Sequence, residues 1–281
     1  MFQVSIHDIE DILRDYGVLS KPVSFTELQR YNYEKNDAKS KEVRMIIKVE
    51  LSDGMSFVMR FKNEHNVTLE LIEKQSGFAE LLLENGIPTP VQYKLAGHFA
   101  RQYVINGYEV MVTVEEYVNG EIKCLDLELA KETGRLLART HAIAQKYNVH
   151  VENKVLFDAF DENDLFSVNA FYALKDQIRD EDKTLFQSIM EKYREYMKIL
   201  EPLKKEPRYA VQGDISICNL YLTANGDLGI FDFNRCGDCD AVMQGVFEAR
   251  LMDYPKEHTK ADEDDYFTAF LEGYQENFTG G

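Results

Sequence analysis

The chain has 281 residues, a formal net charge of −17, 44% apolar residues and 29% charged residues. This composition excludes a fibrous or disordered chain and suits one large domain or two smaller lobes. There is no run of about 18 apolar residues and no basic, then apolar, N-terminal signal, so we expect neither a membrane span nor secretion. The four cysteines are too few for a disulfide framework, which favours a cytoplasmic protein. The acidic balance disfavours nucleic acid and favours a cationic ligand.

The first part of the chain, to about residue 118, is predicted to form strands, tight turns and two helices. A short helix begins after Ser5, which can cap it, and ends at Gly17. Asp-Gly and Asn-Gly pairs between apolar runs predict two hairpins. The hairpin strands are expected at residues 43–51 with 55–62, and at residues 101–105 with 108–116. A second helix is expected between the hairpins, at about residues 67–84.

The pattern becomes helical after Gly120. Apolar residues recur with the helical period in three segments, at residues 129–144, 185–200 and 266–274. We therefore predict an α+β protein with two lobes. Residues 1–118 would form a small antiparallel sheet lobe with one inserted helix, and residues 119–281 a larger, mainly helical lobe. A cleft between two such lobes is a usual place for a ligand site.

Residues 209–232 interrupt the helical pattern and carry the candidate catalytic groups. Asp214 stands in a tight glycine loop, where its carboxylate can accept a hydrogen bond from an attacking hydroxyl. Asn219 follows five residues later, and a predicted hairpin then folds Asp232 beside it. Amide and carboxylate oxygens suit Mg²⁺. Each residue alone is equally well explained by a helix cap, a turn or a buried ion pair, but the three at this spacing favour phosphoryl transfer.

This segment, Gln-Gly-Asp-x-x-x-x-Asn, then a hairpin and Ile-Phe-Asp-Phe, resembles the catalytic core of the aminoglycoside phosphotransferase and choline kinase superfamily. The resemblance extends to Gly-Ile-Pro-Thr-Pro (86–90), Glu-Glu-Tyr-Val-Asn-Gly (115–120) and Gly-Arg-Leu-Leu-Ala-Arg-Thr-His (134–141). It implies a protein-kinase-like fold and an enzyme that uses ATP or GTP with Mg²⁺. The acceptor would be a hydroxyl of a small, amine-bearing molecule. Asp214 would be catalytic, and Asn219 and Asp232 would hold metal.

The resemblance also assigns the nucleotide to the first lobe. Val58, Arg60 and Lys62 share one face of a strand because side chains alternate with a period of two. In the family, an apolar residue covers adenine and a cation two residues later reaches the phosphates, which Val58 and Arg60 match. Lys62 is a competing candidate, and either cation can instead be a solvated strand-edge charge. The predicted hinge is expected to meet the purine edge through the backbone of Glu116, Tyr117 and Val118.

Three departures from the family pattern leave alternatives open. The acid that usually pairs with the cation is expected on the helix at residues 67–84, but Gln75 stands at the expected offset, which leaves Glu73 as the candidate acid. No glycine-rich loop is present at residues 31–41, and Asn234 stands where protein kinases have Gly. A protein kinase is one alternative, which these features disfavour. A kinase-like nucleotide-binding or sensor protein with weak catalysis is the other, which the intact catalytic set disfavours.

Overall fold

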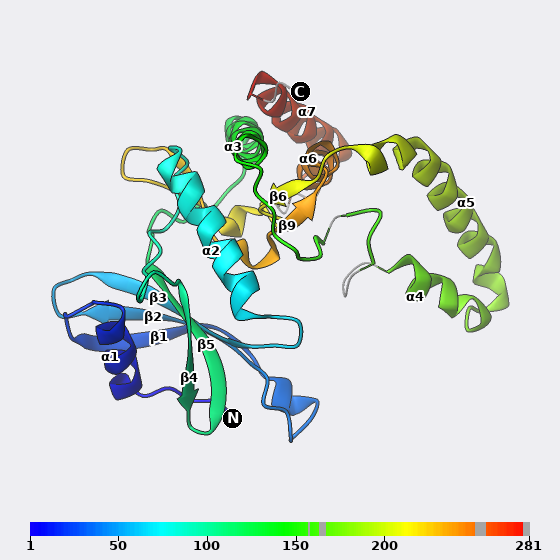
Figure 1. Ribbon diagram of the computed structural model, residues 1–281. Coiled ribbons are helices and arrows are strands. Elements are labelled where there is room, and N and C mark those ends of the chain that lie inside the picture. The colour runs from blue at the N-terminus through cyan, green and yellow to red at the C-terminus, as the bar shows by residue number, and fades with distance from the viewer. Residues whose placement is uncertain (157, 163–166, 251–256, 278–281) are drawn as a thin grey trace. The chain divides into compact units, whose positions relative to one another are not determined.

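The structure is a computed structural model that describes residues 1–156, 158–162, 167–250 and 257–277. The chain divides into two compact units (Figure 1). The first unit comprises Met1–Glu121 and Tyr221–Asn234, and the second comprises Ile122–Leu220 and Arg235–Gly281. The first holds an antiparallel sheet and the second is mainly helical, which confirms the predicted α+β class.

The sheet of the first unit has five antiparallel strands in the order β1-β2-β3-β5-β4. The strands are β1 (Pro22–Tyr31), β2 (Val43–Leu51), β3 (Ser56–Asn63), β4 (Ala100–Ile105) and β5 (Tyr108–Glu116). Both predicted hairpins are confirmed, with Gly54 and Gly107 at positive φ in their turns. Strand β1 was not predicted from the sequence, because nearly all of its residues are exposed and two register shifts interrupt its pairing with β2.

Helices α1 (Ile6–Asp15) and α2 (Leu69–Glu84) belong to the first unit. Ser5 caps α1 as predicted, and the apolar stripe of α1 joins the core under one face of the sheet. Thr68 caps α2, whose Leu71 N–H donates to the Thr68 hydroxyl oxygen. α2 lines a small cavity together with the polar face of β3 and β5. This arrangement gives the strands one apolar face and one face with charged side chains.

A short hairpin, β7 (Leu220–Leu222) with β8 (Leu228–Ile230), leads to Asp232. It is anchored within the first unit, because Ile230 N–H donates to the Pro88 carbonyl at 2.9 Å and Leu222 N–H donates to the Gly120 carbonyl at 2.9 Å. Phe233 then packs edge-on against Phe78 of α2. The hairpin therefore holds the segment around Asp232 against the sheet unit.

The second unit is mainly helical and holds a two-stranded sheet. Its helices are α3 (Leu127–Lys146), α4 (Val168–Ala173), α5 (Lys183–Leu200), α6 (Ala241–Arg250) and α7 (Lys260–Asn277), and its strands are β6 (Tyr209–Val211) and β9 (Gly237–Cys239). The predicted long helices are confirmed in α3, α5 and α7. Among the residues that the structure describes, no helix is both long and apolar enough to cross a membrane.

Helices α3 and α7 approach each other closely through two glycines. A Cβ added at Gly273 would lie 1.9 Å from the Lys131 carbonyl oxygen, and one at Gly134 would lie 2.0 Å from the Phe270 carbonyl oxygen. His141 of α3 is buried beside this crossing, with a ring nitrogen 2.8 Å from the Tyr274 hydroxyl. Burial lowers the pKa of His141 to about 3, so this side chain is a neutral part of the core.

Short 3₁₀ turns complete both units. They lie at Tyr33–Lys35, Leu174–Asp176, Asp180–Asp182, Glu201–Lys205, Ile217–Asn219 and Phe233–Arg235. The turn at Ile217–Asn219 carries a predicted metal ligand, and the turn at Phe233–Arg235 begins directly after another. Both candidate ligands are therefore set by tight local backbone geometry.

Candidate active site

The loop that follows β6 carries Asp214 in a constrained conformation. Gly213 has a φ of +87°, and a Cβ there would lie 2.2 Å from the Arg235 carbonyl oxygen, so no other residue fits. The backbone N–H of Asp214 donates to the Gln212 side-chain oxygen at 2.7 Å. The loop is thus fixed on both sides of Asp214, which suits a carboxylate that must meet a reacting hydroxyl at a defined place.

Asn219 contacts the Asp214 loop within the second unit. Its side chain is nearly buried, and its Nδ2 donates to the Asp214 backbone carbonyl at 2.8 Å. The amide nitrogen is used by the loop, whereas the amide oxygen accepts, from the described residues, only a long contact from the Cys218 thiol at 3.9 Å, which a cation could replace. Asn219 therefore both closes the loop and presents the atom type that Mg²⁺ prefers.

Glu248 of α6 supports this loop and was not identified from the sequence. Its Oε2 accepts the Ile215 N–H at 3.1 Å, and its Oε1 accepts a hydrogen bond from the Gln244 side-chain nitrogen. The residue is only 4% exposed, and burial raises the pKa of Glu248 to about 8. In the sequence, Glu248 stands among apolar residues at 241–250. To recognise it as a buried acid, one must know which face of this helix is buried.

In the first unit, Asp232 follows β8 in a left-handed backbone conformation with a φ of +59°. This conformation is uncommon outside glycine, although Asp tolerates it better than most residues. The Oδ1 of Asp232 accepts the Asn234 N–H at 3.3 Å and lies 3.5 Å from Nη1 of Arg60. Burial by itself raises the pKa of Asp232, but the charges of Arg60 and Lys62 lower it overall. The carboxylate is therefore held ionised.

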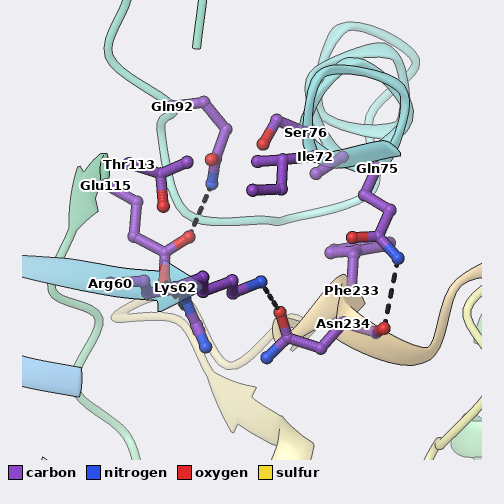
Figure 2. Close-up of a pocket in the computed structure, with 11 residues that line it drawn as sticks. Arg60, Lys62, Ile72, Gln75, Ser76, Gln92, Thr113, Glu115, Phe233 and Asn234 are labelled. Carbon is purple, nitrogen blue, oxygen red and sulfur yellow. Dashed lines mark hydrogen bonds and ion pairs between the residues drawn. The ribbon is translucent and has the colours of Figure 1, made fainter. Parts of the chain in front are cut away.

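Arg60 lies on β3 and is buried in an ion pair with Glu115 of β5 (Figure 2). Nε and Nη2 of Arg60 lie 2.9 Å and 2.8 Å from Oε1 of Glu115. Gln92 donates to the other oxygen of Glu115 at 2.8 Å. Burial by itself lowers the pKa of Arg60, and the carboxylates of Glu115 and Asp232 raise it overall. Arg60 is thus a fixed, permanent cation and not a solvated edge charge.

Lys62 lies one step further along the same face of β3 and is also buried. Its ammonium group donates to the side-chain oxygen of Asn234 (Figure 2). Burial, followed by the charge of Arg60, lowers the pKa of Lys62 to about 8. Arg60, Lys62 and Asn234 line a cavity of about 30 Å³ between the strands and α2. Both candidate cations therefore face this cavity.

The structure does not place Glu73 with Arg60, although the sequence analysis named it as the candidate acid. The Glu73 carboxylate accepts the Ala100 N–H at 2.8 Å, at the start of β4. Gln75, at the expected offset on α2, donates to the Asn234 backbone carbonyl at 3.1 Å. The acid that pairs with Arg60 is Glu115, which precedes the predicted hinge contacts. Sequence periodicity alone did not reveal it, because the pairing depends on the register between β3 and β5.

The predicted hinge uses two of its three backbone N–H groups within the sheet unit. Glu116 N–H donates to the Val91 carbonyl at 2.9 Å, and Tyr117 N–H donates to the Ser56 carbonyl at 3.0 Å. Among the described residues, Val118 N–H makes no backbone hydrogen bond. Val58 is buried on β3 opposite Glu115, on the face shared with Arg60. Of the three N–H groups predicted to meet the purine edge, that of Val118 is therefore the one without a backbone partner among the described residues.

No family model and no curated protein sequence matches the chain. Solved structures do match it over nearly its full length. Amicoumacin kinase, in complex with AMP-PNP, Ca²⁺ and its ligand Ami, aligns with a TM-score of 0.67 at 16% identity, covering 97% of this chain and 79% of that one. Spectinomycin phosphotransferase, in complex with ADP and spectinomycin, aligns at 0.55 and 14%, covering 97% and 80%.

The choline kinase of Streptococcus pneumoniae aligns with a TM-score of 0.53 at 14% identity, covering 94% of this chain and 80% of that one. The chain has the fold of the small-molecule kinases. This confirms the predicted two-lobed, kinase-like fold. Within this kinase fold, the described residues pair Asp214 with Asn219 in one unit and Arg60 with Asp232 in the other.

Proposed function

We propose that this chain is an ATP- or GTP-dependent phosphotransferase that phosphorylates a hydroxyl of a small, amine-bearing molecule. One observation carries the proposal. Arg60, the predicted phosphate cation, lies 3.5 Å from Asp232, the predicted metal ligand. A nucleotide phosphate with its divalent cation would satisfy both charges, since the phosphate oxygens need a cation and the metal needs a carboxylate. The neighbouring kinase structures, solved with AMP-PNP and Ca²⁺ or with ADP, support this choice of ligand.

Unsatisfied donors in the same cavity support an anionic ligand. Nδ2 of Asn234 is buried and makes no hydrogen bond with the described residues, and Nη1 of Arg60, also buried, has among them only the Asp232 carboxylate at 3.5 Å. Buried donors of this kind are usually satisfied by water or by ligand oxygens. The cavity of about 30 Å³ beside them has room for roughly one water molecule or one oxygen-bearing group.

The donor set fits Mg²⁺. Within the described part of the chain, the Asn219 amide oxygen has only a long contact with the Cys218 thiol, which a cation could replace, and Asp232 is held ionised by its cationic neighbours. Among the described residues there is no group of three or more His, Cys, Asp or Glu side chains that could hold a metal by itself. Mg²⁺ in nucleotide sites is typically bound by one or two protein groups together with phosphate oxygens and water. When bound, the ion would neutralise charge on the transferring phosphoryl group.

Each remaining residue has a defined task. Asp214, fixed by its loop, accepts a hydrogen bond from the acceptor hydroxyl, orients it and takes its proton. Arg60 binds phosphate oxygens with a planar, permanently charged group. Val58 covers the base, and Val118 N–H donates to its edge. Residues 1–118 thus bind the nucleotide, while residues 119–281 supply the catalytic and metal groups.

The net charge of −17 supports a cationic acceptor. Structural neighbours include an aminopropanol kinase, whose name denotes an amine-bearing hydroxyl compound. All four cysteines are free thiols, which supports a reducing, cytoplasmic setting. The base contact proposed at the Val118 N–H would decide between ATP and GTP.

The test is phosphoryl transfer from labelled ATP or GTP to a panel of hydroxylated amines and amino sugars, with Mg²⁺ present. Asp214→Ala should bind nucleotide normally but lose turnover by roughly 10³-fold, as expected for a removed general base. Asp227→Asn, in the exposed turn of the β7–β8 hairpin, is the matched control and should keep full turnover.

Two results would contradict the proposal. Full turnover in Asp214→Ala would remove this carboxylate from the mechanism. If the wild-type protein binds neither ATP nor GTP in the presence of Mg²⁺, measured by isothermal titration calorimetry, the kinase function is wrong.

A further inference from the structure

The acid that holds Arg60 comes from the same sheet and not from helix α2. β3 and β5 are antiparallel neighbours, with Val58 opposite Glu115 and Arg60 opposite Thr113. Residues opposite each other point to the same face, so the carboxylate and the guanidinium meet diagonally across two strands. The pairing is therefore set by strand register, which the backbone hydrogen bonds of the sheet fix.

Glu115 holds one edge of the guanidinium, and the remaining nitrogen faces Asp232. Its Oε1 binds Nε and Nη2, while Nη1 forms an ion pair at 3.5 Å with Oδ1 of Asp232. An arginine side chain has several rotatable bonds, but two contacts on one edge of a planar group fix the direction of the third nitrogen. Gln92 in turn holds the second oxygen of Glu115. Both charged residues are 8% exposed, so water does not weaken the contact.

Helix α2 offers no carboxylate to this network. The side chains of α2 that line the cavity are Ile72, Gln75, Ser76 and Ala79. Glu73, the acidic residue of α2 that stands nearest to Gln75 in the sequence, binds the Ala100 N–H instead. Gln75 contacts the Asn234 carbonyl, so α2 is tied to the segment after Asp232 but not to Arg60 (Figure 2).

We propose that Glu115 is a positioning residue that orients Arg60 toward the nucleotide phosphates from within the sheet, a role that rests on the proposed phosphate binding by Arg60. The direction of the cation then does not depend on the position of α2. Without the Glu115 charge, Asp232 is the carboxylate partner of Arg60 that the described residues still provide. Nη1 of Arg60 already faces this carboxylate at 3.5 Å, so without Glu115 the whole guanidinium would shift onto Asp232 and away from the phosphates.

The test compares two ligands that share base and ribose, adenosine and ADP, by isothermal titration calorimetry with Mg²⁺. The ratio of their dissociation constants reports phosphate binding alone. Arg60→Ala and Glu115→Gln should each lower the preference for ADP by roughly tenfold, the usual effect of losing a charged hydrogen bond, and leave adenosine binding unchanged. Because Glu115 acts through Arg60, the double variant should resemble Arg60→Ala alone. Glu109→Gln, the same change at an exposed position of β5, is the matched control.

The possible outcomes separate this role from the proposed function. A normal ADP preference in Glu115→Gln, with a reduced one in Arg60→Ala, would overturn the role of Glu115 and leave the function intact. A normal preference in Arg60→Ala would instead overturn phosphate binding by Arg60. Equal losses for adenosine and ADP in Glu115→Gln would mean that Glu115 shapes the base pocket, which also overturns its positioning role.

Folding of the variant is checked independently. Glu115→Gln leaves a buried arginine with one carboxylate partner fewer, so circular dichroism and thermal unfolding accompany the binding data. Glu115→Asp keeps the buried charge, but its side chain is one methylene group shorter, so the carboxylate lies further from Arg60. It should fold and show an ADP preference between those of the wild type and Glu115→Gln, and an unchanged preference in this variant would count against the proposal.

Discussion

Replacing Glu248 by glutamine should remove a pH dependence of folding stability that one buried carboxyl imposes. Burial raises the pKa of Glu248 from its ordinary value of 4.5 to about 8, and the charge of Asp214 adds to the increase. In the unfolded chain the carboxyl ionises near pH 4.5, whereas the folded protein keeps it protonated to much higher pH. The contribution of this group to stability is therefore complete below pH 4.5 and is lost as the pH rises through 8.

The size of the effect follows from the shift. Each unit of pKa difference is worth about 1.4 kcal/mol, so the free energy of unfolding should fall by about 3 to 4 kcal/mol between pH 5 and pH 8 from this group alone. Glutamine has the same shape and does not titrate. Its oxygen can accept the Ile215 N–H, and its nitrogen can donate to the Gln244 Oε1, which has no partner among the described residues, once that amide turns over.

The assay is urea denaturation of the wild type and Glu248→Gln between pH 5 and pH 8. Far-UV circular dichroism is the signal, because the chain has no tryptophan. The difference in unfolding free energy between the two proteins should grow steadily with pH in favour of Glu248→Gln. Glu191→Gln, at an exposed site on α5, should follow the wild type. Parallel curves for wild type and Glu248→Gln would refute the reasoning, since they would show that Glu248 does not hold its proton in the folded state.

Three further predictions concern packing, charge and thiols. Gly273→Ala should lower the free energy of unfolding by about 2 to 4 kcal/mol, because its methyl group would meet a carbonyl oxygen of α3. Gly77→Ala is the control and should be neutral or stabilising, because its Cβ would lie 3.8 Å from the Phe99 ring. Equal effects of the two substitutions in thermal unfolding would contradict this. At pH 8, Lys62 should take up about half a proton when the protein binds nucleotide, because burial lowers the pKa of Lys62 to about 8. In calorimetry, the binding heat should then depend on the ionisation heat of the buffer, and Lys62→Met should abolish this dependence. The same buffer dependence in Lys62→Met would show that Lys62 is not the group that takes up the proton. Cys124 and Cys218 are exposed and should react first with a thiol reagent, while the two buried thiols, whose pKa values burial raises, should react only on unfolding; a single rate for all four would disagree.

The sequence predicted those elements whose signals are local. The Asp-Gly and Asn-Gly turns defined two hairpins, and the helical period located α3, α5 and α7. Strand β1 could not be predicted, because its side chains are almost all exposed and the sequence shows no regular alternation of apolar and polar residues there. A strand held chiefly by backbone pairing with β2 leaves little trace in side-chain pattern.

The candidate site was predictable to the extent that its residues are neighbours in sequence. Asp214 and Asn219 lie in one loop, and the structure joins them by a side-chain hydrogen bond. Glu115 was missed because its pairing with Arg60 depends on the register of two strands that are more than fifty residues apart. Glu248 was missed for a similar reason, since a buried acid reveals its task only through the backbone N–H that it contacts.

The segment Tyr221–Asn234 has a consequence for how the protein is made. It belongs to the first unit, although the whole of Ile122–Leu220 is synthesised before it. A nascent chain therefore carries all five strands of the sheet long before it carries Phe233, the aromatic partner of Phe78. During synthesis, the first unit therefore stays incomplete until residue 234 has left the ribosome, and the side chains that contact Tyr221–Asn234 remain exposed until then. A chain that stalls before that residue would present an incomplete surface to chaperones and proteases.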